Sequence, residues 1–184
     1  MSNLRCIYVL KIYQPKLKKM TIKLDYSDCH LKNVLQSINS IALIGASKTQ
    51  QRPSYFVMKY MQKKGYRVIP INPKYAGDKI LGELIYPSLT KCDQHIDMVD
   101  IFVSKNQISF ITKEAVSNKK RLRISYLWMQ LGLIDLDASK IAAEAGITVI
   151  MNRCPKIEYS RLSGEISWNG INSEFFTSRR NGLL

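Results

Sequence analysis

Residues 40–53 read S-I-A-L-I-G-A-S-K-T-Q-Q-R-P, and this stretch combines a buried strand, a tight turn and the start of a helix. Residues 41–44 are an unbroken apolar run, as in a parallel strand that is buried on both faces. Gly45 lets the backbone turn tightly and approach a ligand, and Pro53 opens a helical pattern. Because the first turn of a helix has free N–H groups and a positive dipole end, the stretch predicts either a phosphate site or a structural turn of the same shape.

The rest of the chain repeats this strand and helix pattern. We expect strands over 67–71, 98–103, 124–129 and 148–151, and helices over 55–64, 107–116 and 135–146. A further helix, capped by Ser27 or Asp28, precedes the first strand and runs to Ile38. Strands that alternate with helices through short connections form a parallel sheet. The sequence therefore predicts an α/β fold, a Rossmann-like doubly wound parallel sheet of about five strands with helices on both faces.

Polar residues and glycines gather where the predicted strands end, at 45–48, 72–74, 104, 130–132 and 152–154. Ligands of doubly wound sheets bind beyond the carboxyl ends of the strands, where the strand order reverses. Turn residues alone would give a similar composition. Five such ends at once favour a ligand site.

The turn after the first strand bears on the kind of nucleotide. An NAD enzyme normally has G-x-G-x-x-G there, and an acid near the end of the second strand for the ribose hydroxyls. This chain reads G-A-S-K-T-Q at 45–50, and its second strand is followed by N-P-K at 72–74. Since Lys74 attracts phosphate, the pattern favours a nucleotide with an extra ribose phosphate, a class that includes NADP and coenzyme A.

The chain is strongly basic, with 28 Lys and Arg against 14 Asp and Glu and a net charge of +14. Such a charge suits nucleic acid, an anionic membrane surface or a phosphorylated small molecule. Residues 1–24 hold six basic side chains, so part of the excess belongs to a terminal segment rather than to a nucleic-acid site. We expect a basic N-terminal extension over 1–26, one domain over 27–162, and a C-terminal tail over 163–184 that docks in part.

The cysteines and histidines are too scattered for a metal or disulfide framework. Cys6, Cys29, Cys92 and Cys154 form no C-x-x-C pair, and the chain has two histidines. The apolar run at 6–10 is too short to span a bilayer and lacks the features of a signal peptide. We therefore expect reduced thiols, no metal, no membrane segment and a cytoplasmic protein.

Six ordered blocks carry a resemblance to a known family. They are I-A-L-I-G-A-S (41–47), R-P-S-Y-x-V-M-K-Y (52–60), G-Y-x-V-I-P-I-N-P-K (65–74), D-M-V-D-I-F (97–102), W-M-Q-L-G (128–132) and N-R-C-P-x-I-E (152–158). Over about residues 27–175 the chain resembles the small stand-alone CoA-binding proteins, which are similar to the CoA-binding domain of the succinyl-CoA synthetase alpha subunit. The resemblance implies binding of coenzyme A or acyl-CoA, a small-molecule nucleotide ligand.

The resemblance also implies which residues hold the ligand. It assigns the phosphates to the G-A-S turn and the helix that follows, the adenosine end to N-P-K and the third strand end, and the pantetheine to the fourth strand end. The residues are Gly45, Ala46, Ser47, Lys48, Arg52, Pro53, Ser54, Asn72, Pro73, Lys74, Phe102, Val103, Ser104, Gln130, Leu131 and Gly132. The chain departs from the family in two places. Val103 replaces an arginine, and K-K-R-L-R at 119–123 replaces a short glycine-containing link. We expect that run to be a solvated basic loop, with a contact for an acidic partner as the alternative.

The sequence favours a binding module over an enzyme. The synthetases use a phosphorylated histidine in a second domain, which has no counterpart here, and no catalytic set of side chains shares one strand end. Cys154 is a candidate reactive thiol, because the charge of Arg153 beside it favours thiolate, although a structural cysteine is the other interpretation. An NADP-linked oxidoreductase and a basic nucleic-acid or protein-binding module remain as alternatives.

Overall fold

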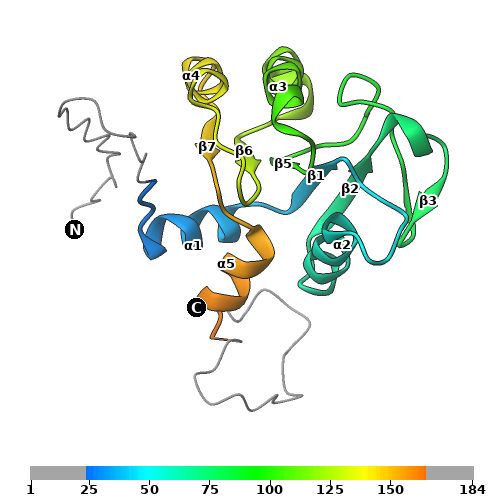
Figure 1. Ribbon diagram of the computed structural model, residues 1–184, viewed down its shortest axis with the longest axis horizontal. Coiled ribbons are helices and arrows are strands. Elements are labelled where there is room, and N and C mark those ends of the chain that lie inside the picture. Colours follow the sequence, from blue (N-terminus) through cyan, green and yellow to red (C-terminus); the bar gives the residue numbers. More distant parts are fainter. Residues whose placement is uncertain (1–23, 165–184) are drawn as a thin grey trace.

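A five-stranded parallel sheet forms the centre of the computed structural model, which describes residues 24–164 (Figure 1). Its strands stand in the order β2-β1-β5-β6-β7. Their bounds are Ser40–Ile44 (β1), Arg67–Ile71 (β2), Met98–Ile101 (β5), Tyr126–Met129 (β6) and Thr148–Ile150 (β7). All four neighbouring pairs are parallel. The expected Rossmann-like doubly wound fold is confirmed. Of the expected terminal segments 1–26 and 163–184, residues 1–23 and 165–184 lie outside the described residues.

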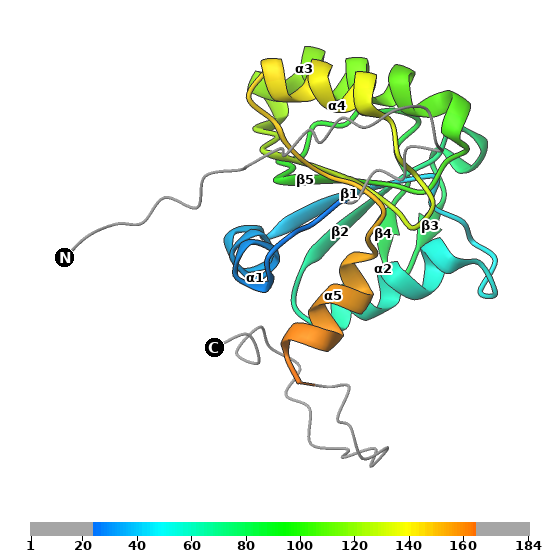
Figure 2. The same cartoon turned by 60° about the vertical axis from the view of Figure 1, so that its left-hand side comes forward.

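Helices cover both faces of the sheet, as Figures 1 and 2 show. One face carries α1 (Asp28–Ser37), α2 (Pro53–Lys63) and α5 (Pro155–Leu162), and the other carries α3 (Ile108–Leu122) and α4 (Leu136–Glu144). Each face has its own apolar core, because side chains alternate between the two faces along every strand. Within residues 24–164 no helix is long and apolar enough to cross a membrane.

Most helix ends follow the sequence signals. The side chain of Ser27 accepts a hydrogen bond from the His30 amide at 3.2 Å and caps α1. Asp135 caps α4 in the same way through the Ala138 amide at 2.9 Å. The structure also contains elements that the pattern did not predict, namely α5 and a short hairpin of β3 (Lys79–Ile80) and β4 (Glu83–Leu84).

Residues just before α1 contact the domain. The Tyr26 hydroxyl accepts a hydrogen bond from the Met151 amide at 2.9 Å, and the Arg153 guanidinium donates to the Leu24 carbonyl at 3.3 Å. The ring of Tyr26 also lies under Arg153, with 5.6 Å between the guanidinium carbon and the ring centroid. Residues 24–26, expected to belong to the N-terminal extension, therefore pack against the end of β7.

The basic run at 119–123 is not the solvated loop that the sequence suggested. It continues α3 to Leu122, and the helix ends at a residue in left-handed conformation. The Lys119 ammonium donates hydrogen bonds to the carbonyls of Ala145 and Gly146 at 2.6 and 3.1 Å. The Lys119 side chain thus satisfies carbonyls that α4 leaves free at its end. The expected solvated loop is wrong because this part of the run is helical and contacts α4.

Arg121→Ala is expected to lower the free energy of unfolding by about 1.5–3 kcal/mol. The Arg121 guanidinium donates to the carbonyls of Leu89, Thr90 and Cys92, so its loss leaves several acceptors of the β4–β5 connection without their donor. Denaturant unfolding measures the change. Lys120→Ala removes one positive charge from an exposed position of the same helix, so it should lower the free energy of unfolding much less. Equal losses in the two variants would contradict the role of Arg121.

Candidate functional site

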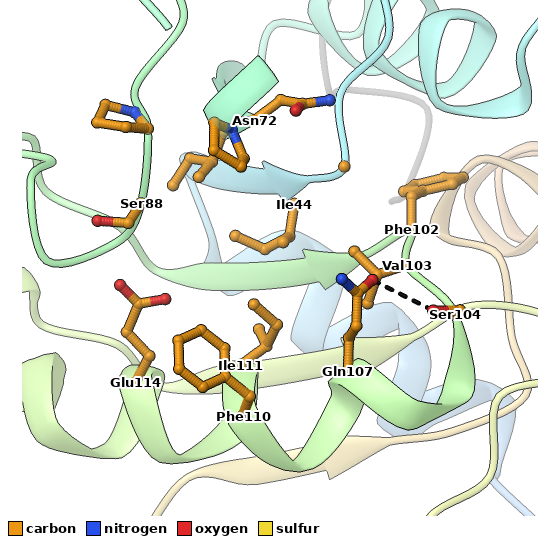
Figure 3. A pocket seen from close by; sticks show the side chains of 14 residues that line it. Ile44, Asn72, Ser88, Phe102, Val103, Ser104, Gln107, Phe110, Ile111 and Glu114 are labelled. Carbon is orange, nitrogen blue, oxygen red and sulfur yellow. Dashed lines mark hydrogen bonds between the residues drawn. The ribbon is translucent and has the colours of Figure 1, made fainter. Parts of the chain in front are cut away.

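A cavity of about 460 Å³ lies where β1, β2 and β5 end (Figure 3). The strand order reverses between β1 and β5, so this is the topological switch point of the sheet. The residues that line it come from these strand ends, from the β4–β5 connection and from α3: Ile44, Gly45, Ile71, Asn72, Pro73, Pro87, Ser88, Phe102, Val103, Ser104, Gln107, Phe110, Ile111 and Glu114. Six of the predicted site residues are therefore brought together: Gly45, Asn72, Pro73, Phe102, Val103 and Ser104.

Gly45 makes the tight turn that the sequence suggested, and the structure adds a second reason for glycine. Its backbone has φ +83°, and a Cβ placed there would lie 2.4 Å from the Phe102 carbonyl oxygen and 3.3 Å from Val103 Cγ1. Its amide donates to the Ile71 carbonyl at 2.9 Å. The close approach that requires glycine is therefore to the backbone after β5, not only to a ligand, and Gly45 holds the three strand ends together around the cavity.

Asn72 joins the G-A-S loop to the N-P-K turn. Its side-chain amide donates to the Ala46 carbonyl at 2.7 Å, and its side-chain oxygen accepts from the Lys74 amide at 3.0 Å. With one side chain bound to both segments, residues 45–48 and 72–74 form one continuous edge, which we call the cationic rim. Asn72 acts there as a structural bridge.

Two lysines of the cationic rim lie against the same aromatic ring. The ammonium groups of Lys48 and Lys74 lie 5.9 and 5.4 Å from the ring centroid of Tyr75. Lys48 also pairs with Asp78 at 2.9 Å, whereas Lys74 makes no ion pair with any residue of the described part of the chain. Lys48 and Lys74 do not themselves line the cavity, but Lys74 is exposed and directly follows Pro73, which does.

The amino end of α2 follows the G-A-S loop. Arg52 occupies the N-cap position without a side-chain hydrogen bond to the helix, and Pro53 begins the first turn. Arg52 and Pro53 are exposed, while Ser54 is buried and does not line the cavity. The Ser47 hydroxyl accepts from the Thr49 amide at 3.2 Å and shapes the loop. The positive end of α2 is therefore free of side-chain capping, as an anion site requires.

The wall contributed by α3 was not foreseen from the sequence. Phe110, Ile111 and Glu114 share one face of α3. Gln107, the N-cap residue just before the helix, completes the spacing i, i+3, i+4 and i+7, and all four residues line the cavity. The same spacing is typical of helices that pack on a core. The signal that distinguishes this face is Phe110, a large apolar side chain that stays 69% exposed.

Three predicted residues lie outside the cavity, at the end of β6. Gln130 is buried and donates to the Asp100 carboxyl at 2.7 Å, the Gly132 amide donates to the Asn152 side chain at 2.8 Å, and Leu131 is exposed. None of the three lines the cavity. Their assignment to the pantetheine side remains a prediction.

Asp100 is a fully buried carboxyl group in the middle of the sheet. Burial raises the pKa of Asp100 to about 8, against the smaller lowering effects of the Gln130 hydrogen bond and the Ile101 backbone. Within residues 24–164 its second oxygen, Oδ2, has no hydrogen-bond partner. The carboxyl group is therefore mostly protonated at neutral pH.

Cys154 is buried at the start of α5. Burial raises the pKa of its thiol, and the nearby Asp100 carboxyl acts in the same direction. Arg153, which was expected to favour the thiolate, instead lies 3.6 Å from Glu158 and donates to the Leu24 carbonyl. The expected lowering of the pKa is therefore wrong, because desolvation dominates, and a reactive role for Cys154 has no support from its surroundings.

In the described part of the chain, no cluster of three or more His, Cys, Asp or Glu side chains could hold a metal ion. Glu114 is the one titratable side chain among the described residues that line the cavity. The geometry is that of a cavity at the switch point of a doubly wound α/β protein, with an apolar wall and the cationic rim beside it.

The chain belongs to the CoA binding domain family, whose model matches residues 39–160. It is 34% identical over 134 residues to the uncharacterized protein YneT of Bacillus subtilis, a match that covers 73% of this chain and 95% of YneT. It is also 30% identical over 119 residues to the ADP-forming acetate–CoA ligase of Methanocaldococcus jannaschii. That match covers 62% of this chain but 17% of the ligase, so the likeness to the ligase concerns one part of a longer protein.

A solved structure supports the same relationship. A hypothetical protein from Pyrococcus horikoshii superposes with a TM-score of 0.68 and 34% sequence identity, covering 74% of this chain and 92% of its own. The resemblance seen in the sequence blocks is thus confirmed at the level of family and fold.

Proposed function

We propose that this protein binds coenzyme A or acyl-CoA at the cavity beside β1 and β5. The observation that carries the proposal is the exposed Lys74, which directly follows the lining residues Asn72 and Pro73 and contacts the same Tyr75 ring as Lys48. A CoA nucleotide carries a ribose 3′-phosphate and a diphosphate, and it needs cations next to a pocket for its base. The family to which the chain belongs supports this ligand.

The residues present fit the ligand in three places. The cavity accepts the nucleoside, since its volume lies in the range of small-molecule pockets and its walls are largely apolar. The cationic rim faces the ribose phosphate. The amino end of α2, with Arg52 and Pro53 exposed and no side-chain cap, offers a positive dipole end to the diphosphate. Pro53 has no N–H, however, and the Tyr55 and Phe56 amides donate to the Arg52 carbonyl.

We propose a binding module rather than an enzyme. General acid–base catalysis uses a titratable group placed at the reacting atoms, and commonly a second one as its partner. Glu114 is the single titratable lining residue of the described cavity, and one of its oxygens is already bound by Thr90. The cavity therefore offers recognition and no paired acid and base.

An NADP-linked oxidoreductase is the alternative that Lys74 also permits, because NADP carries a ribose phosphate too. Parallel calorimetric titrations with CoA, 3′-dephospho-CoA, NADP and NAD separate the two. We expect CoA to bind most tightly, and tighter binding of NADP would overturn the proposal. Salt-sensitive oligonucleotide binding that competes with CoA would instead indicate a nucleic-acid module.

Lys74→Ala is expected to weaken CoA binding about ten- to a hundredfold, because a charge-assisted hydrogen bond contributes about 1.5–3 kcal/mol. The variant should also lose the preference for CoA over 3′-dephospho-CoA. Lys63→Ala removes an equal, exposed charge at the other end of α2 and serves as the matched control. If Lys74→Ala and Lys63→Ala bind CoA with the same affinity, Lys74 does not contact the ligand.

A further inference from the structure

The α3 wall combines an apolar ring with an acid. Phe110 and Glu114 are four residues apart on the same helix, and Figure 3 shows both side chains facing the cavity across from Asn72 and Ser88. Phe110 is 69% exposed, so its ring is free to cover a flat ligand. The acid beside it requires a separate explanation, because a carboxylate repels the phosphates that the cationic rim attracts.

Glu114 is held in one orientation by Thr90. The amide and the hydroxyl of Thr90 both donate to Oε1 of Glu114, each at 2.9 Å. No residue in the described part of the chain donates to the other oxygen, Oε2. A carboxylate can only accept hydrogen bonds, so Glu114 presents one fixed anionic acceptor at the cavity.

A flat ring next to one acceptor matches a base that carries one exocyclic amino group. We propose that Phe110 and Glu114 determine specificity for the base of the nucleotide: Phe110 stacks on the ring, and Oε2 of Glu114 accepts a hydrogen bond from the amino group of adenine. This inference rests on the proposed CoA binding. Guanine presents two neighbouring hydrogen-bond donors, which would need both carboxylate oxygens of Glu114 as acceptors. Oε1 is already bound by Thr90. Hypoxanthine presents a carbonyl oxygen in place of the amino group, which Glu114 repels.

The test compares CoA with desamino-CoA, in which hypoxanthine replaces adenine, by calorimetric titration of the whole protein. The wild type should bind CoA about ten- to a hundredfold more tightly, as expected for one hydrogen bond to a charged group. Phe110→Ala should weaken both ligands about five- to a hundredfold and leave their ratio unchanged, because stacking does not depend on the amino group.

Glu114→Gln should change the preference for CoA over desamino-CoA. The two Thr90 donors require an acceptor, so they hold the carbonyl oxygen of the glutamine, and its NH₂ group takes the place of Oε2. That NH₂ group donates to the carbonyl of hypoxanthine and repels the adenine amino group. Glu114→Gln is therefore expected to bind desamino-CoA at least as tightly as CoA, with thermal unfolding close to that of the wild type.

Each outcome has a distinct meaning. Equal binding of CoA and desamino-CoA by the wild type overturns the role of Glu114 but leaves CoA binding itself intact. A loss of affinity for 2′-deoxy-CoA without a loss for desamino-CoA assigns Glu114 to the ribose and also overturns the inference. A wild type that binds none of these ligands refutes the proposed function, and the inference falls with it.

Discussion

Gly45→Ala should lower the free energy of unfolding by about 2–5 kcal/mol, the sum of a left-handed backbone and a steric overlap. The added Cβ would lie 2.4 Å from the Phe102 carbonyl oxygen, which belongs to the backbone and cannot rotate away. The strand ends of β1 and β5 must separate to accept it. Because both ends line the cavity, CoA affinity should fall together with stability, which denaturant unfolding and calorimetry measure on the same sample.

The matched control is Gly65→Ala. Gly65 has φ +86°, close to that of Gly45, but no atom lies within 4 Å of the position that its Cβ would take. The free energy of unfolding of this variant should therefore fall only by the backbone strain, about 1–2 kcal/mol. Equal losses of stability in the two variants would show that the contact with Phe102 does not matter and that conformation alone requires glycine at position 45.

The sequence predicted the sheet well because buried parallel strands are short apolar runs between turn signals. The bounds of β2 were predicted to the residue, and the other strands to within a few residues. The sequence analysis missed α5, because this helix has only eight residues and no capping side chain marks its start. It also ended α3 too early, because nothing local shows that Lys119 and Arg121 find carbonyl partners on other segments.

The site was predictable in part for a related reason. Loop residues at strand ends are marked by glycine, proline and charge, so the cationic rim could be located from the sequence. The α3 wall could not, since Phe110 and Glu114 have the spacing of any amphipathic helix. The role we propose for them depends on the position of α3 beside the cavity, and only the three-dimensional arrangement places Thr90 next to Glu114.

Asp100 should make the protein less stable as the pH rises. The folded state keeps its carboxyl group protonated up to a pKa of about 8, whereas the unfolded chain loses that proton near the ordinary value of 3.8. Between these two values unfolding releases a proton, so a higher pH favours the unfolded state. The stabilisation is complete below about pH 4 and is lost as the pH rises towards 8.

Asp100→Asn is expected to remove this slope, because an amide does not titrate. The difference in unfolding free energy between variant and wild type should change in favour of the variant by about 1.4 kcal/mol per pH unit, or about 4 kcal/mol between pH 5 and pH 8. The buried amide costs stability of its own, but this cost is independent of pH. The Cys154 thiol, the neighbouring titratable group, has a raised pKa and stays neutral over this range.

Asp28→Asn provides the comparison that isolates the effect. The hydrogen bond from Arg161 lowers the pKa of Asp28, so that group titrates below the pH 5–8 window and its removal should leave the slope in that window unchanged. Denaturant unfolding at four pH values measures all three proteins. If the wild type and Asp100→Asn change in parallel between pH 5 and 8, Asp100 is ionised in the folded protein, and its buried Oδ2 must then have a hydrogen-bond donor that compensates the charge.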